Sequence, residues 1–232
     1  MQARRIDQIL SNHGYCSRSE ARAWLKAGRV TVSGVPAQSP DEKADPTLVI
    51  VDGEPVEHPH GILAVIHKPA GFVCSHDRNE GPTIYELLPE RWSQRNPSIT
   101  TIGRLDKDTT GVLLVSDDGE LVHRWTSPKH KVAKIYEVTV NQDLQPRLTS
   151  LFASGELLLD GEDKPCVPAK LEIISAREAR LELTEGRYHQ VKRMFSNQGF
   201  DVLRLHRSRF GEFELGDLLP GQLRLLPINQ FQ

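Results

Sequence analysis

The densest group of reactive side chains lies between two glycines, in the run GRLDKDTTG at residues 103–111. Glycines allow tight backbone turns, so a carboxylate between them, Asp106 or Asp108, could be held rigidly in a cleft. Spacing alone favours a simpler structure, an Asp-rich turn in which Asp108 caps the backbone. Two carboxylates at i and i+2 match neither a glycosidase acid/base pair nor an EF-hand loop. The run therefore supplies a candidate acidic group without defining a reaction.

A tyrosine occupies a strand-like segment further along the chain. Residues 134–140 alternate in polarity, so Tyr136 shares the apolar face with Val138 and Val140. A tyrosine on such a face usually belongs to the core. In a cleft lined by the same face, its ring could stack on a base and its hydroxyl could move a proton. Both interpretations stay open at this point.

A predicted helix over residues 188–198 carries the third candidate group. A helical projection gives a buried stripe made of Val191, Met194 and Phe195. Lys192 lies at the edge of that stripe, where its stem can follow apolar surface and its ammonium can reach a neighbouring cleft. Arg193 points away from the stripe and is better placed to hold a phosphate. The alternative for Lys192 is a lysine that simply extends into solvent.

The net charge hides an uneven distribution. The 232 residues contain 29 Lys and Arg against 31 Asp and Glu, a net charge of -2 that taken alone argues against a nucleic-acid partner. Basic residues nevertheless outnumber acidic ones in three separated segments, 1–30, 121–135 and 185–209, while 31–60 is acidic. One such segment could be a solvated face. Three together favour RNA or DNA, because they could hold phosphates at defined places.

The first basic segment is predicted to form two short helices. Hydrophobic spacing predicts one helix over 4–12, and a capping box at Ser17 and Glu20 predicts a second that follows it. On this second helix three basic side chains recur every four residues and would form a stripe that faces phosphates: Arg18, Arg22 and Lys26.

The Pro- and Gly-containing segment 55–61 is typical of a linker and predicts two domains, 1–58 and 59–232. In the larger domain, strands are predicted at 63–67, 112–116, 135–140, 170–174, 179–183 and 202–206. Helices are predicted at 83–88, 119–125, 146–153 and 188–198. This order lacks the strict βαβ alternation of a doubly wound fold. It predicts an α+β protein with a mixed, largely antiparallel sheet and a central cleft.

Several classes of protein are excluded or disfavoured. No apolar run approaches the roughly 18 residues of a membrane span, and no apolar segment of a secretory signal follows the N-terminal charges, so we expect a cytoplasmic protein. The cysteines, Cys16, Cys74 and Cys166, are far apart and are expected to be reduced. Motifs of P-loops, dinucleotide sites, serine hydrolases and zinc proteases are absent. His58 and His60 have no obvious third ligand, so no metal is expected.

Four ordered motifs resemble the pseudouridine synthases of the RsuA type: HKPAGFVCS from His67, GRLDKDTTG from Gly103, KIYEVTV from Lys134 and EGRYHQVKRMF from Glu185. The segment RRIDQILSNHGYCSRSEARAWLKAGRVTVSG resembles an S4 RNA-binding domain. The segments SPKHKVAKIYEVTV, DKPCVPAKLEI and EGRYHQVKRM look closer to enzymes of small-subunit ribosomal RNA (16S rRNA) than to their large-subunit relatives. The resemblance covers essentially the whole chain.

The resemblance implies a reaction and the residues for it. Uracil is detached from C1′ of its ribose, turned in the pocket and reattached through C5, with no cofactor and no external nucleophile. The catalytic residues would be Asp106, Tyr136 and Lys192, the last at a position where some relatives carry arginine. Ionised Asp106 would attack C1′ or remove the C2′ proton to give a glycal, and both routes stay open. A paired Lys192 would keep Asp106 anionic in a partly dry cleft.

The expected partner is ribosomal RNA within a small-subunit assembly intermediate. We expect the protein to be a monomer and to have no membrane partner. Because the target base must leave its stack, Arg104 beside Asp106 is our expected wedge into the vacated space. The other expected RNA contacts are Arg187, His189, Gln190, Arg193, Arg18, Arg22, Lys26, Lys129 and Lys131.

Three alternative functions compete with this one. The same enzyme could act on large-subunit (23S) ribosomal RNA, which only a substrate assay decides. A non-catalytic S4-type RNA-binding assembly protein is disfavoured by the set Asp106, Tyr136 and Lys192. A carboxylate-based hydrolase is disfavoured by the basic segments and by the lack of a spaced acid pair.

Overall fold

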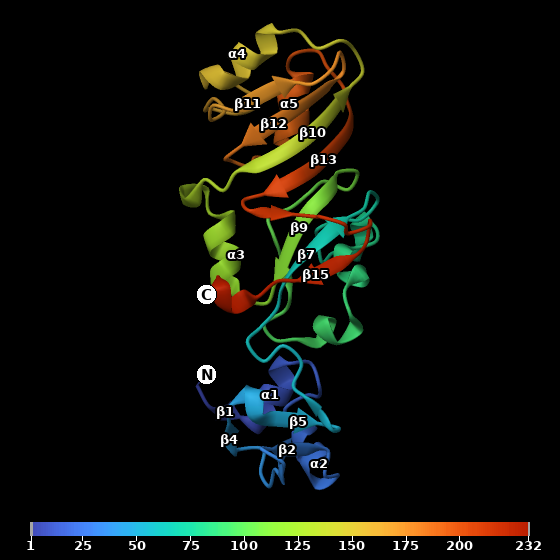
Figure 1. Cartoon of the computed structure of the whole chain (residues 1–232), viewed down its shortest axis with the longest axis vertical. Helices are drawn as coiled ribbons and strands as arrows, with labels where there is room; N and C mark the ends of the chain where they lie inside the picture. The colour runs from blue at the N-terminus through green and yellow to red at the C-terminus, as the bar shows by residue number, and fades with distance from the viewer. Residues whose placement is uncertain (1, 232) are drawn as a thin grey trace.

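The computed structural model describes residues 2–231 and shows an elongated molecule with a small N-terminal module at one end (Figure 1). The module contains the helices α1 (Ile6–Asn12) and α2 (Ala21–Lys26). Its strands are β1 (Arg4–Arg5), β2 (Val30–Val32), β3 (Val35–Pro36), β4 (Lys43–Ala44), β5 (Val49–Val51) and β6 (Glu54–Pro55). Strands β3-β2-β5-β6 form a sheet and β1 pairs with β4. Both helices share one hydrophobic core with β2 and β5.

The predicted stripe of three basic residues on one helix is wrong, because α2 begins only at Ala21. Arg18 lies in the turn before the helix, where its guanidinium is 3.3 Å from the buried carboxylate of Asp7. Arg22 and Lys26 do lie on α2, and both are exposed. The buried charge of Asp7 thus draws Arg18 away from the helix face.

The larger domain is built on one mixed sheet. Its strands are β7 (Leu63–Lys68), β8 (Thr100–Ile102), β9 (Thr110–Ser116), β10 (Lys134–Val140), β11 (Lys170–Ile173), β12 (Glu178–Leu183), β13 (Val202–Phe210), β14 (Phe213–Glu214) and β15 (Leu223–Leu225). The order is β11-β12-β10-β13-β9-β7-β15, with β14 on β13 and β8 on β9. Among the described strands of this sheet only the β9–β13 pair is parallel. The predicted α+β class with a largely antiparallel sheet is confirmed.

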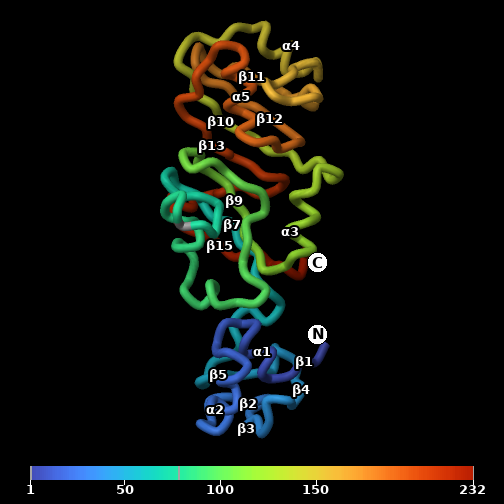
Figure 2. The backbone as a smooth tube through the Cα atoms, turned by 180° about the vertical axis from the view of Figure 1, so that it is seen from behind, coloured from blue at the N-terminus to red at the C-terminus, as the bar shows by residue number. Residues whose placement is uncertain are grey.

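Helices cover the two halves of this sheet, as Figures 1 and 2 show from opposite sides: α4 (Arg147–Ser154) and α5 (Gln190–Ser196) lie with β10 to β13, and α3 (Gly119–Thr126) lies with β7 and β9. The 3₁₀ segments are η1 (Pro46–Leu48), η2 (Arg78–Glu80), η3 (Ile84–Leu87), η4 (Glu90–Gln94), η5 (Pro128–His130) and η6 (Ile228–Gln230). The helices predicted at 119–125 and 146–153 are confirmed. No helix within residues 2–231 is long and apolar enough to cross a membrane.

Two other predicted helices differ from the structure. The segment 83–88 forms only the 3₁₀ turn η3. The helix predicted from 188 begins at Gln190, because His189 takes a left-handed backbone conformation with φ 46°. The predicted buried stripe is confirmed, since Val191, Met194 and Phe195 are all 5% exposed or less.

The two halves of the sheet meet at a very close backbone contact. In the parallel β9–β13 pair, Gly111 lies opposite Arg207. A Cβ atom at Gly111 would lie 2.2 Å from the carbonyl oxygen of Arg207, and its φ of +117° is also unfavourable for other residues. The second glycine of the GRLDKDTTG run is therefore needed to join the halves of the sheet.

The segment predicted as a linker is held by a buried ion pair that we call the clamp. Arg95 and Asp117 lie 2.8 Å apart, with side chains 3% and 8% exposed. Arg95 also donates to the carbonyl oxygens of Glu57 and His58, both at 3.2 Å. Asp117 accepts from the backbone N–H of Ile62 at 2.6 Å. The clamp thus fixes the start of the larger domain to the end of the module.

Candidate active site

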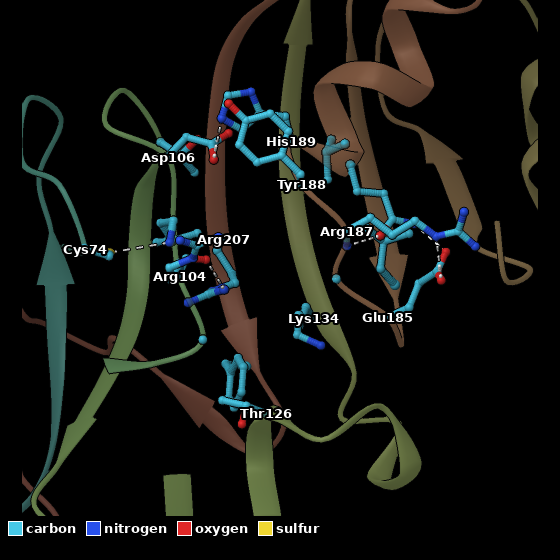
Figure 3. Close-up of a pocket in the computed structure, with 18 of the residues that line it drawn as sticks. Cys74, Arg104, Asp106, Thr126, Lys134, Glu185, Arg187, Tyr188, His189 and Arg207 are labelled. Atoms are coloured by element: carbon cyan, nitrogen blue, oxygen red, sulfur yellow. Dashed lines mark hydrogen bonds and ion pairs between the residues drawn. The ribbon is translucent and has the colours of Figure 1, made fainter. Parts of the chain in front are cut away.

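A cleft of about 630 Å³ opens where β9 and β13 meet (Figure 3). Its walls come from the loop 103–109, the segment 125–132, strand β10, the motif 183–191 and strand β13. Basic side chains outnumber acidic ones among the lining residues: Arg104, Lys107, Lys134, Arg187 and Arg207 against Glu80, Asp106 and Glu185. The predicted central cleft is therefore present, and its lining has more positively than negatively charged side chains.

A buried lysine holds the loop that carries the candidate aspartate. Lys68, at the end of β7, is fully buried. Its Nζ donates to the carbonyl oxygens of Pro69, Asp106, Lys107 and Thr109 at 2.7 to 3.2 Å. Burial lowers the pKa of Lys68 to about 8. Nothing in the local sequence distinguishes Lys68 as a positioning residue, although it lies in the HKPAGFVCS motif.

The carboxylate of Asp106 lines the cleft with a side chain that is 26% exposed. Its neighbours are Nε2 of His189 at 3.4 Å and Nζ of Lys192 at 3.8 Å. The structure thus brings together three predicted site residues from two distant motifs. The carboxylate is presented into the cleft while its own backbone carbonyl is held from behind by Lys68.

Lys192 contacts Asp108 more closely than Asp106. Its Nζ is 2.6 and 2.7 Å from the two carboxylate oxygens of Asp108. Although partial burial works in the opposite direction, the hydrogen bond and charge of Lys192 hold the pKa of Asp108 below its ordinary value. The expected ion pair between Lys192 and Asp106 is present at 3.8 Å, but Lys192 is shared with Asp108, which it contacts more closely.

Tyr136 belongs to the core and to the cleft at once. Its side chain is 9% exposed and packs in the main hydrophobic cluster of the larger domain. It also lines the cleft. Val138 and Val140 on the same face are buried, as the alternation predicts. The two interpretations of the tyrosine are thus compatible in this fold.

Several expected RNA contacts are already engaged within the protein. Gln190 is buried and donates to Glu185 at 2.5 Å. Arg187 and Arg193 contact the same carboxylate, that of Glu162, at 3.5 and 2.8 Å. Both arginines also donate to backbone carbonyls of the loop 160–165. The two arginines fix that loop against the motif, and the contact of all three side chains with RNA stays a prediction.

The remaining predicted RNA contacts are accessible. His189 is stacked on Tyr188, with ring centroids 3.9 Å apart, and Tyr188 is 68% exposed at the cleft. Arg104 is exposed and lines the cleft beside Asp106. Lys129 and Lys131 are exposed and lie within the segment 125–132, which forms the other end of the cleft. Their contact with RNA also stays a prediction.

Two further cations, Arg207 and Lys134, line the cleft and form what we call the cleft floor. Neither is among the site residues predicted from the sequence. Arg207 is 1% exposed, donating from Nε to Val112 O at 2.8 Å and from Nη1 to Arg104 O at 3.4 Å. Its Nη2 has no hydrogen-bond partner within the described residues. Lys134 donates to Val132 O at 3.0 Å. Burial, helped by the charge of Arg207, lowers the pKa of Lys134 to about 8.

Comparisons with known proteins agree with this geometry. Residues 62–197 match the family of RNA pseudouridylate synthases, and residues 4–50 match the S4 domain. A ribosomal small subunit pseudouridine synthase A of Pasteurella multocida is 39% identical over 97% of both chains. The protein of the same name from Escherichia coli K12 is 39% identical over 96% of both.

A solved structure, a crystal structure of a pseudouridylate synthase, superposes with a TM-score of 0.68 at 34% identity and covers 97% of both chains. The likeness thus extends over both the module and the sheet domain rather than over the cleft alone. The chain therefore belongs to the RNA pseudouridylate synthase family and carries an S4 domain on its N-terminal side.

Proposed function

We propose that this enzyme converts a specific uridine of small-subunit ribosomal RNA to pseudouridine, with Asp106 acting on the ribose. The observation that carries the proposal is the presentation of one carboxylate into a basic cleft, with a tyrosine in the wall of the same cleft. The relatives that share about 40% of the sequence over nearly the whole chain are named as enzymes of the small ribosomal subunit. This favours the small-subunit substrate over the large-subunit alternative.

The reaction needs no group beyond the protein and the RNA. The bond from C1′ to N1 of uracil breaks, a bond from C1′ to C5 forms, and the C5 proton is exchanged for a proton on N1. Asp106 is placed to attack C1′ or to remove the C2′ proton, and both routes require its ionised form. His189 and Lys192 lie beside this carboxylate at 3.4 and 3.8 Å, Lys192 while also bound to Asp108. The ring of Tyr136 offers a surface for the turning base.

Positioning of the RNA completes the proposal. Arg104 enters the space left by the flipped base, next to Asp106. The exposed Arg18, Arg22 and Lys26 of the module and Lys129 and Lys131 beside the cleft hold phosphates, in a monomer that acts on an assembly intermediate of the small subunit in the cytoplasm. Phosphate contacts of this kind predict RNA affinity that falls with salt by roughly 0.7 per contact on a log–log slope for single strands.

The test is a map of pseudouridine in ribosomal RNA, by carbodiimide labelling and primer extension, in a strain that lacks the gene. One uridine of the small subunit is expected to lose its mark. Wild-type protein is expected to restore the mark, and Asp106→Asn is expected to fail while being present at equal amount. If no site of the small subunit changes, the substrate is wrong. If Asp106→Asn restores the mark, the role of Asp106 is wrong.

A further inference from the structure

The floor of the cleft holds two positive charges that lie against one aromatic ring. Nζ of Lys134 is 5.6 Å from the ring centroid of Phe210, and the guanidinium carbon of Arg207 is 5.2 Å from the same centroid. Both side chains line the cleft. Lys134 comes from β10 and Arg207 from β13, so the sheet itself fixes the distance between the two charges.

Among the described residues no carboxylate lies within ion-pair distance of either charge, and Glu185 acts on Lys134 only from further away. The hydrogen bonds of Lys134 and Arg207 go to backbone carbonyls, those of Val132, Val112 and Arg104. One nitrogen of the buried Arg207 has no partner at all within residues 2–231. A buried charge without a counterion is unfavourable for folding. The arrangement is therefore explained best by an anion that reaches the floor from outside the protein.

The position of Lys134 indicates which part of an RNA would reach it. Lys134 and Tyr136 lie two residues apart on one face of β10, about 7 Å along the strand. Figure 3 shows Lys134 between Asp106, at one end of the cleft, and Thr126 at the other. A ribose held at Asp106 thus leaves Lys134 beside the backbone that continues toward the segment 125–132, where Lys129 and Lys131 are exposed.

We propose that Lys134, with Arg207 beneath it, forms a phosphate subsite inside the cleft that takes a phosphodiester next to the target uridine. The inference rests on the proposed function and adds a defined contact to it. Lys134 donates to the phosphate oxygens, and Arg207 acts through its charge from below the floor. A neutral carbonyl of uracil would leave both charges without a counterion, so the anionic group fits the floor better.

The test uses the full chain with Asp106→Asn, so that RNA binds without turnover, and an RNA fragment that spans the mapped uridine. Lys134→Gln is expected to weaken binding about tenfold at low salt. It is also expected to reduce the log–log salt slope by about 0.7, the value for one phosphate contact on a single strand. Lys134→Arg is expected to restore most of both. Lys170→Gln, which removes an exposed lysine on β11 outside the cleft, is the control without effect.

To identify which phosphate binds Lys134, the phosphodiesters on the 5′ and 3′ sides of the uridine are replaced one at a time by neutral methylphosphonates. One position is expected to weaken binding to the Lys134 chain about tenfold and to have no further effect with Lys134→Gln. The subsite is overturned if Lys134→Gln and the methylphosphonate weaken RNA binding additively. It is also overturned if Lys134→Gln leaves the salt slope of binding unchanged. If Lys134→Gln does not fold, a scan of the Lys134 chain without any sensitive position also overturns it. Turnover of the fragment by the unmodified enzyme tests the proposed function separately.

Discussion

The clamp and the cleft floor both bury arginine, but they treat its charge in opposite ways. In the clamp, Arg95 is paired with Asp117 at 2.8 Å and all its remaining nitrogens bond to carbonyls. In the cleft floor, Arg207 has only carbonyl partners and keeps one nitrogen unpaired within the described chain. The paired Arg95 stabilises one arrangement of the chain, whereas the charge of Arg207, which has no counterion in ion-pair contact, is available to bind an anionic ligand. The counterion thus separates structural from functional burial in this protein.

The largest effect on stability is expected when the clamp is broken. Asp117→Asn leaves the buried guanidinium of Arg95 uncompensated, which is expected to lower the free energy of unfolding by about 3–5 kcal/mol in urea titrations. Asp143→Asn is the matched control, because Asp143 pairs with Arg177 in solvent, with side chains 75% and 60% exposed. If both variants lower the free energy of unfolding by the same amount, the clamp is energetically no different from a surface ion pair.

Lys68 is a third buried cation and sharpens the comparison, because it binds four carbonyls around the Asp106 loop. Lys68→Met is expected to lower kcat about 100-fold through misplacement of Asp106. The KM for RNA should change by only a few fold, since Lys68 is fully buried and does not touch the substrate. Single-turnover kinetics separate the two quantities, and a rise in KM at unchanged kcat would contradict a positioning role.

Arg104 tests the exposed side of the same cleft. Arg104→Ala is expected to reduce modification of structured RNA about tenfold, because the side chain fills the space left by the flipped base. An unstructured fragment, whose base is already free, should be affected much less. The backbone carbonyl that accepts from Arg207 is kept in this variant, so the loop is expected to stay in place. Equal losses on both RNAs would exclude the wedge.

The smallest effect is a gain in stability on removing a functional charge. Burial, helped by the charge of Arg207 and opposed by that of Glu185, lowers the pKa of Lys134 from 10.5 to about 8. A lysine with a depressed folded pKa destabilises the fold below pH 8, and this penalty disappears as pH rises toward 10.5. Lys134→Met is therefore expected to raise the free energy of unfolding by about 1 kcal/mol at pH 7.

Urea titrations across pH check this sign. Wild type is expected to gain stability relative to Lys134→Met between pH 8 and 10.5, the two pKa values of the lysine. A variant that is less stable than wild type at pH 7 would indicate that Lys134 is structural. The cleft floor would then resemble the clamp.

Local pattern was sufficient for the strands that bury one apolar face. The predicted runs 63–67, 112–116 and 135–140 became β7, β9 and β10 within two residues at each end. Short strands such as β8 and β15 were missed, because three residues carry too little periodicity to be recognised. The helix from 188 was predicted too long, since nothing in its spacing reveals the left-handed turn at His189.

The candidate site was predictable where chemistry is local and not where it depends on pairing of strands. Asp106 and Tyr136 stood out by motif and alternation. Arg207 was counted in a basic segment with Arg204 and Arg209, yet those two are exposed and Arg207 is buried. The inward side chain of Arg207 bonds to the carbonyl oxygens of Val112 and Arg104, which are far away in sequence and come close only because β13 pairs with β9.

The path of the chain through the sheet has a consequence for synthesis on the ribosome. Strand β15 pairs with β7, so the half of the sheet begun at Leu63 is completed only after β10 to β13 have been made. Residues 223–231 must leave the ribosome before that half can close, and Phe231 then packs against Trp125 and Phe213. The S4 domain needs only local contacts and can fold first. A nascent enzyme is thus able to fold its RNA-binding domain well before its cleft exists.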